Sequence, residues 1–222
     1  MVTVTFYHDA DGGRAPAGRA GRGRGRLGGK GLPVTAVMDG PADTRAMAIV
    51  HGALRRDLGR ARAALTAVPH PRDRQREAIG EHVTWLMEFL HHHHDGEDNG
   101  LWPLVRRRKP AAGALLDGMD ADHRRIEPAM AATASAAREY AASAADQARV
   151  GLAAAIDVLN AVLEPHLDRE VAEVMPVVSA SITQREWHEW EQAYNVRPRS
   201  FMQLGAIGHW LLDGIDPTAM TW

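Results

Sequence analysis

The sequence predicts an all-α protein: an antiparallel up-down four-helix bundle with a disordered N-terminal tail and a short helical C-terminal extension. Four segments with helical periodicity, each about 25 to 35 residues long, follow one another with short breaks, as in helices that run back and forth in a bundle. An alternating, strand-like pattern occurs only at Val2 to Tyr7. The chain has no cysteine, which excludes disulfides, thiolate zinc sites and cysteine nucleophiles.

The four helices are expected at about 43–68, 71–108, 111–145 and 146–181. Prolines are expected to end two of the helices: Pro69 and Pro71 follow the first helix, and Pro110 follows the second. Pro128 is expected to interrupt the third helix, which is rich in alanine. The chain therefore divides into a tail over 1–42, the bundle over 43–181 and an extension over 182–222.

The N-terminal tail is expected to be disordered, because residues 8–33 are mainly Gly and Arg and lack the apolar residues of a core. Six basic residues against two aspartates give residues 1–33 a charge of +4, which leaves −6 on the rest of the chain. The acidic remainder argues against nucleic acid as a partner. The start resembles no signal peptide, and the longest apolar stretch, 150–163, is too short to span a bilayer. We therefore expect a cytoplasmic protein without a membrane partner.

The C-terminal extension contains four of the six tryptophans of the chain, namely Trp187, Trp190, Trp210 and Trp222. Exposed tryptophans in such number are unusual without a contact. We expect the extension to pack on the bundle, and it is also a candidate for contact with a protein partner.

A pair of residues typical of metal sites occurs twice. His93 and Glu97 lie four residues apart, as do His166 and Glu170, and each Glu is followed six residues later by a proline. The two copies are 73 residues apart. A spacing of four puts both side chains on one face of a helix, and here both pairs interrupt an apolar stripe. A carboxylate in a core must be paired or bound to a cation, so each pair predicts metal ligands.

The other two helices each place a histidine on or beside the apolar stripe. His51 lies inside the stripe of the first helix, and His123 lies at the edge of the stripe of the third. Glu127 follows His123 by four residues and is the seventh candidate ligand. His94 and Asp98 are held in reserve at the edge of the second stripe, whereas His91 and His92 are expected to point into solvent. The candidate metal ligands are therefore His51, His93, Glu97, His123, Glu127, His166 and Glu170.

A mixed set of imidazoles and carboxylates suits iron better than calcium, magnesium or a structural zinc. Six or seven ligands are too many for one four-coordinate ion, but two metals that share bridging carboxylates would use them all. We assign the four histidines as terminal ligands, with Glu97 and Glu170 as bridges.

With these residues in place, the chain resembles the hemerythrin-like, or HHE cation-binding, family over about residues 43–181. The segments FLHHHHDGEDNGLWPL and HLDREVAEVMPVV look particularly like bacterial members. The resemblance implies a non-haem di-iron centre, bridged by carboxylates and an oxo or hydroxo group. One iron would keep an open position for O2, peroxide or NO.

The chain departs from the oxygen-carrying members in two places. Glu127 stands where those proteins have a second histidine, and Glu170 comes one residue earlier than their carboxylate, with Val171 at the usual position. The resemblance thus implies sensing, storage or detoxification of oxidants, with peroxide or NO reduction as a candidate activity, more than reversible oxygen transport.

Two other interpretations stay open at this point. In one, the bundle is a metal-responsive interaction module whose occupancy changes the contacts of the extension, without turnover. In the other, it is an enzyme with one divalent metal on three histidines; the two glutamates argue against this interpretation, because such a site needs neither of them.

Overall fold

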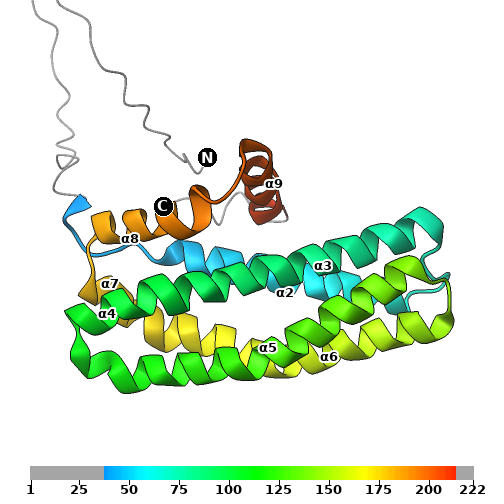
Figure 1. Cartoon of the computed structure of the whole chain (residues 1–222), viewed down its shortest axis with the longest axis horizontal. Helices are drawn as coiled ribbons and strands as arrows, with labels where there is room; N and C mark the ends of the chain where they lie inside the picture. Colours follow the sequence, from blue (N-terminus) through cyan, green and yellow to red (C-terminus); the bar gives the residue numbers. More distant parts are fainter. Residues whose placement is uncertain (1–37, 214–222) are drawn as a thin grey trace, which may run out of the picture.

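The computed structural model of the 222-residue chain describes residues 38–213. Figure 1 shows an all-helical fold whose main helices lie side by side along one long axis. The α-helices are α2 (Arg45–Thr66), α3 (Asp73–Gly96), α4 (Trp102–Arg108), α5 (Gly113–Ala142), α6 (Asp146–Arg169), α7 (Met175–Ser181), α8 (Gln184–Glu191) and α9 (Phe201–Leu212). Shorter π-helical turns span Glu97–Leu101, Glu170–Val174 and Gln192–Val196, and a 3-10 turn spans Pro110–Ala112.

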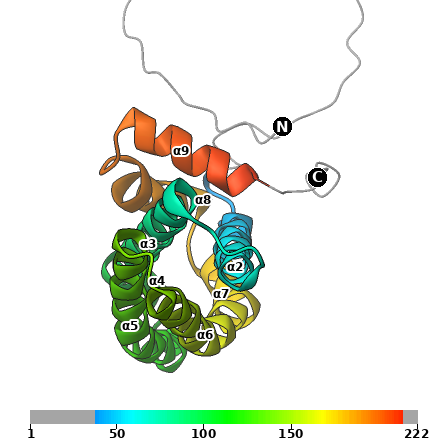
Figure 2. The same cartoon turned by 90° about the vertical axis from the view of Figure 1, so that its right-hand side faces the viewer.

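The predicted antiparallel four-helix bundle is confirmed. Its four rods are α2, α3 continued by α4, α5, and α6 continued by α7 (Figures 1 and 2). α3 packs closely along α5, and α5 along α6, whereas α2 approaches α3 less closely. The expected extents of the rods are reproduced to within a few residues at their ends, because prolines and chain reversals mark the breaks.

Both long rods that carry a His/Glu pair contain a π-helical turn that begins at the glutamate. In these turns, the N–H of Trp102 donates to the carbonyl of Glu97, and the N–H of Met175 donates to that of Glu170. The next residue in each rod is a proline, which has no N–H to donate and would clash with the preceding turn of a regular α-helix. The wider turn accommodates the proline, so the rod continues beyond it.

Two expectations need correction. α5 runs without interruption through Pro128, because packing against α3 and α6 on either side holds the helix together. Residues 39–42 do not belong to a loose tail: the N–H of Ala42 donates to the carbonyl of Ile182 at 3.2 Å, and Ala42 is buried. The expected disorder of 8–33 and the strand-like Val2 to Tyr7 lie outside the described residues.

The C-terminal extension packs on the bundle, as expected, and buries Trp187, Trp190 and Trp210; Trp222 lies outside the described residues. Thr183 caps α8 and Ser200 caps α9, each through a reciprocal capping box. Figures 1 and 2 both place α8 and α9 against the side of the bundle formed by α2 and α3, away from α5 and α6.

The first part of the extension docks on the π-helical turn after His93. The indole of Trp190 donates to the carbonyl of Gly96 at 2.8 Å, and the hydroxyl of Tyr194 donates to the carbonyl of Asn99 at 3.0 Å. Asn99 lies four residues before Pro103, which cannot donate to it, so Tyr194 supplies the missing donor. A Cβ at Gly100 would lie 2.4 Å from Tyr194 Cε2, so only glycine permits this approach.

The rod of α6 and α7, Asp146–Ser181, is long and apolar enough to cross a membrane by length and composition. A core helix passes the same test, and one apolar face of this rod is buried in the centre of the bundle. We therefore interpret it as a core helix.

Candidate metal centre

The candidate ligands form one polar layer across the apolar core. On each rod, apolar residues lie directly before and after the layer: Met47 and Leu54 around His51, Leu90 and Leu101 around the α3 residues, Met119 and Ile126 around His123, and Leu163 and Val174 around His166 and Glu170. The candidate ligands thus lie on the buried face of each rod, and all four rods place them at the same level along the bundle axis.

The layer contains two groups of three side chains. His51, His93 and Glu170 form one group, and His94, His123 and His166 form the other; within each group the potential ligand atoms lie within 4.8 Å of one another. All six residues are buried. We call them the His51 group and the His94 group. Either one is compact enough to hold a metal ion.

Glu97 lies between the two groups. Its Oε1 is 3.1 Å from Nε2 of His93, and its Oε2 is 3.5 Å from Nε2 of His123. Glu170 spans them in the same way, since its Oε2 lies 3.3 Å from Nε2 of His51 and 3.7 Å from Nε2 of His166. Each carboxylate therefore reaches one histidine of each group, an arrangement that could bridge two cations.

The buried polar atoms of the layer fit a metal better than a metal-free core. Both oxygens of Glu97 and of Glu170 lack a hydrogen-bond partner among the described residues, as do the Nε2 atoms of His94, His123 and His166. Buried polar atoms are nearly always satisfied in proteins, and a cluster of orphaned ones needs an explanation. Cations coordinated at these nitrogens and oxygens would satisfy all of them at once.

The electrostatics of the layer favour neutral imidazoles. Burial lowers the pKa of His93 to about 3, helped by the neighbouring His51, and burial lowers the pKa of His166 to about 4. Burial, then the nearby His123, also lowers the pKa of His94 well below its ordinary value. A neutral imidazole keeps a free lone pair, so these three side chains are ready to bind a metal at neutral pH.

The two carboxyl groups differ in charge in the absence of a metal. Burial raises the pKa of Glu97 well above its usual range, and repulsion from Glu170 adds to the effect. Burial also opposes ionisation of Glu170, but the nearby imidazoles, with His51 first, outweigh burial and lower the pKa of Glu170 to about 2. One carboxylate is thus ionised and its neighbour is held as the acid; divalent cations would let both ionise.

One further carboxylate orients an imidazole of the layer, and a second lies near another imidazole. Nδ1 of His123 lies 2.7 Å from Oδ1 of Asp98, so its N–H donates to that carboxylate and Nε2 stays free to face the layer. Asp122, which is buried and paired with Arg169, lies 3.8 Å from Nδ1 of His166. Asp98, expected only as a reserve ligand, is therefore placed as a support for His123.

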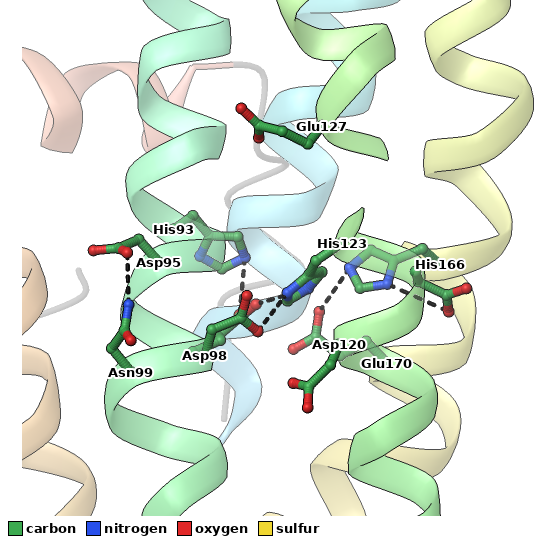
Figure 3. Close-up of polar contacts among 12 residues, drawn as sticks. His93, Asp95, Asp98, Asn99, Asp120, His123, Glu127, His166 and Glu170 are labelled. Atoms are coloured by element: carbon green, nitrogen blue, oxygen red, sulfur yellow. Dashed lines mark hydrogen bonds and ion pairs between the residues drawn. The ribbon is translucent and has the colours of Figure 1, made fainter. Parts of the chain in front are cut away.

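Six of the seven predicted ligands meet in the layer, and Glu127 does not. Figure 3 shows Glu127 away from the clustered side chains. Its side chain is 55% exposed and lies 3.4 Å from Nδ1 of His91. Four residues on a helix turn 40° past a full circle, and His123 already stands at the edge of the inner face. The same turn that keeps Glu97 inside therefore carries Glu127 out into solvent.

His94, also held in reserve, takes the seventh place. Its ring stacks on that of His123 with centroids 4.0 Å apart and lies 5.3 Å from that of His166. A signal for it exists in the sequence, because Val83, Met87, Leu90, His94 and Leu101 follow steps of three, four and seven on a second buried seam. His91 and His92 are exposed, as expected.

The comparisons with known proteins agree with this picture. A family model described as the hemerythrin HHE cation-binding domain matches residues 43–178, more than half of the chain. The matched range includes Glu97 and all six residues of the two groups. No curated protein and no solved structure matched the chain.

Proposed function

Since the chain belongs to the hemerythrin HHE cation-binding family, we propose that it holds a non-haem di-iron centre that binds small oxidants such as O2, H2O2 or NO. The role would be sensing, storage or detoxification of these molecules. His51, His93, His94, His123 and His166 would be terminal ligands, and Glu97 and Glu170 would bridge.

The observation that carries the proposal is the position of the two glutamates. Glu97 lies within 3.5 Å of histidines from both groups, and Glu170 lies within 3.7 Å of one histidine from each. A single metal on three histidines would need neither carboxylate, yet both are fully buried, and a buried carboxylate without a cation is strongly unfavourable. Two metals use both carboxylates, so a dinuclear centre is favoured over a mononuclear one.

The identity of the metal rests on the donor set. Five imidazoles with two carboxylates and no thiolate suit iron, whereas a structural zinc favours four ligands and hard cations favour oxygen alone. A bound iron pair would supply an exchangeable coordination position and the electrons that oxidant chemistry requires. The His51 group has two imidazoles and the His94 group has three, so the open position is expected at the His51 group.

The protein residues themselves keep the layer dry and ordered. His51, Glu97 and Glu170 are fully buried, and apolar residues cover the layer above and below. Asp98 holds His123 in the tautomer whose Nε2 faces inward. Low water access strengthens the electrostatic interactions of the site and limits loss of reactive species to solvent.

The test is the metal content and the optical spectrum of protein purified from iron-fed cells. Two irons per chain, with near-ultraviolet absorption that responds to azide or peroxide, are expected. The metal-free protein, titrated with Fe(II) under anaerobic conditions, should bind two equivalents. One metal per chain without such absorption would overturn the proposal and favour a mononuclear site.

A further inference from the structure

The side of the bundle between α2 and α3 differs from the other three. These two rods carry His51 and His93, whose Nε2 atoms lie 3.4 Å apart across the seam. α2 and α3 nevertheless approach each other less closely than α3 and α5 or α5 and α6 do. Figures 1 and 2 show α9 lying on this side of the bundle. The C-terminal extension therefore lies over the seam between α2 and α3, on the side of the bundle where His51 and His93 face each other.

Trp210 of α9 is anchored to both rods. Its indole N–H donates to Oδ2 of Asp57 on α2 at 3.0 Å. Its ring meets those of Trp85 and Phe89 on α3 edge to face, with centroids 5.1 Å and 4.7 Å apart. His82 shares the same carboxylate oxygen at 2.8 Å. Such a buried, hydrogen-bonded tryptophan is a specific latch and not a loosely packed apolar side chain.

Phe89 connects this latch to the candidate metal ligands. It precedes His93 by one turn of α3 and lies nearly parallel to its ring, with centroids 6.4 Å apart and an angle of 13° between the planes. The ring of His93 in turn lies 5.5 Å from that of His51. Ring contacts therefore run from Trp210 to Phe89 and from Phe89 to His93. The guanidinium of Arg199 lies 5.8 Å from the centre of the Phe89 ring and completes the cover.

Apart from Trp210 and the partly buried Ile207 and Leu211, which pack on the core, the contacts that hold the end of α9 are polar. Arg56 donates to the carbonyls of Trp210 and Asp213, and Arg60 pairs with the carboxylate of Asp213. Arg60 and Asp213 are about half exposed, and exposed ion pairs contribute little stability. Phe201 and Met202 at the start of α9 are also largely exposed. Segments with such contacts open at lower free energy than a packed core.

We propose that α9 is a gate over the His51 group, with Trp210 and Phe89 as the residues that control the passage of small ligands and metal ions. The proposal rests on the proposed metal centre, since the His51 group is the one expected to keep an open position. It assigns the C-terminal extension a role in access, in addition to packing.

The first test is the rate at which excess EDTA removes the metal from the loaded, full-length protein. Trp210→Ala should speed up removal at least about tenfold, with an equilibrium metal affinity that changes much less, because a gate alters entry and exit together. Trp210→Phe keeps a ring but loses the bond to Asp57, so its rate of metal removal should lie between those of Trp210→Ala and the unaltered protein. The matched control is His209→Ala, which changes an exposed neighbour on α9. Its rate of metal removal should equal that of the unaltered protein.

The second test is the association rate of azide with the loaded protein, followed by stopped-flow absorption. It should rise in Trp210→Ala and not in His209→Ala. Unchanged removal and association rates in a Trp210→Ala protein that binds two metals would overturn the gate and leave the metal centre standing. Weakened equilibrium binding in proportion to the faster removal would also overturn it, because Trp210 would then only support the ligands. A protein that binds no metal would overturn both proposals.

Discussion

Replacement of Glu97 by glutamine tests the bridging role most directly. Glu97 is fully buried, and burial together with Glu170 holds it largely in the acid form when no metal is bound. Glutamine has nearly the same shape as the protonated side chain. The metal-free variant should therefore fold, at a cost of at most about 1–3 kcal/mol for the extra buried N–H donor of the amide, so a complete loss of metal binding cannot be attributed to misfolding.

The loss of metal binding can be estimated from the geometry. The two oxygens of Glu97 lie 3.1 Å and 3.5 Å from histidines of different groups, so the variant loses an anionic ligand for both metals and turns an amide N–H2 toward one of them. Removing a supporting partner one layer further out weakens metal binding by about 10- to 100-fold, and a direct ligand should matter at least as much. A 100-fold weaker affinity removes about 2.7 kcal/mol of metal-linked stability.

The assay is thermal unfolding with and without two equivalents of Fe(II), together with metal content after desalting. For a chain of this size, 1 kcal/mol corresponds to about 2–4 °C in Tm, so the metal-dependent rise in Tm should shrink by about 5–11 °C. Glu127→Gln is the matched control: the same change on a half-exposed glutamate outside the layer should alter nothing. If Glu97→Gln kept two irons and the full rise in Tm, the bridging assignment would be refuted.

Four further predictions follow from the same contacts. His94→Ala should lose about half of the bound metal, whereas His92→Ala, which alters an exposed neighbour, should keep it all in the same metal analysis. Asp98→Asn should weaken metal affinity by about 10- to 100-fold in a competition titration, and full affinity would show that the bond to His123 has no role. The pKa of His166 is about 4 in the folded protein against 6.5 in the unfolded chain, so the unfolded state binds more protons between these values. In denaturant unfolding of the metal-free protein, His166 should contribute a stability loss on the order of 3 kcal/mol as pH falls from 6.5 to 4, and His93 and His94 should add to it; a flat profile would contradict the burial of these imidazoles. Gly100→Ala places a Cβ 2.4 Å from Tyr194 Cε2 and should undock the first part of the extension, seen as faster limited proteolysis there; unchanged cleavage would refute this packing.

Helical periodicity was sufficient to predict the four rods and the positions of His51, His93 and His166. These three side chains lie within the apolar stripes, and all are buried in the polar layer. Periodicity works here because each rod is long and has one continuous buried face. The expectation that Pro128 would interrupt the third helix was wrong, because tertiary packing on α3 and α6 outweighs the local preference of proline to break a helix.

Glu127 was predicted as the seventh ligand, but His94 occupies that place in the layer. This difference shows where helical periodicity stops being informative. Both residues stand near the edge of a stripe, so their direction depends on how far each rod is rotated about its own axis. α3 packs closely on α5, and this contact brings His94 onto the ring of His123 while it leaves Glu127 outside, beside His91. A rotation of some tens of degrees decides between these outcomes, and no local spacing encodes it.

The sequence by itself determined that four amphipathic rods would carry two His/Glu pairs, because the spacing of residues along a helix is a local property of the backbone. Only the tertiary structure decided that Glu97 and Glu170 each reach both groups of histidines and that α9 covers the seam between α2 and α3 (Figure 2). Those relations join residues that lie far apart in the chain, and they depend on the rotation and packing of whole helices, which contacts among all four rods set together.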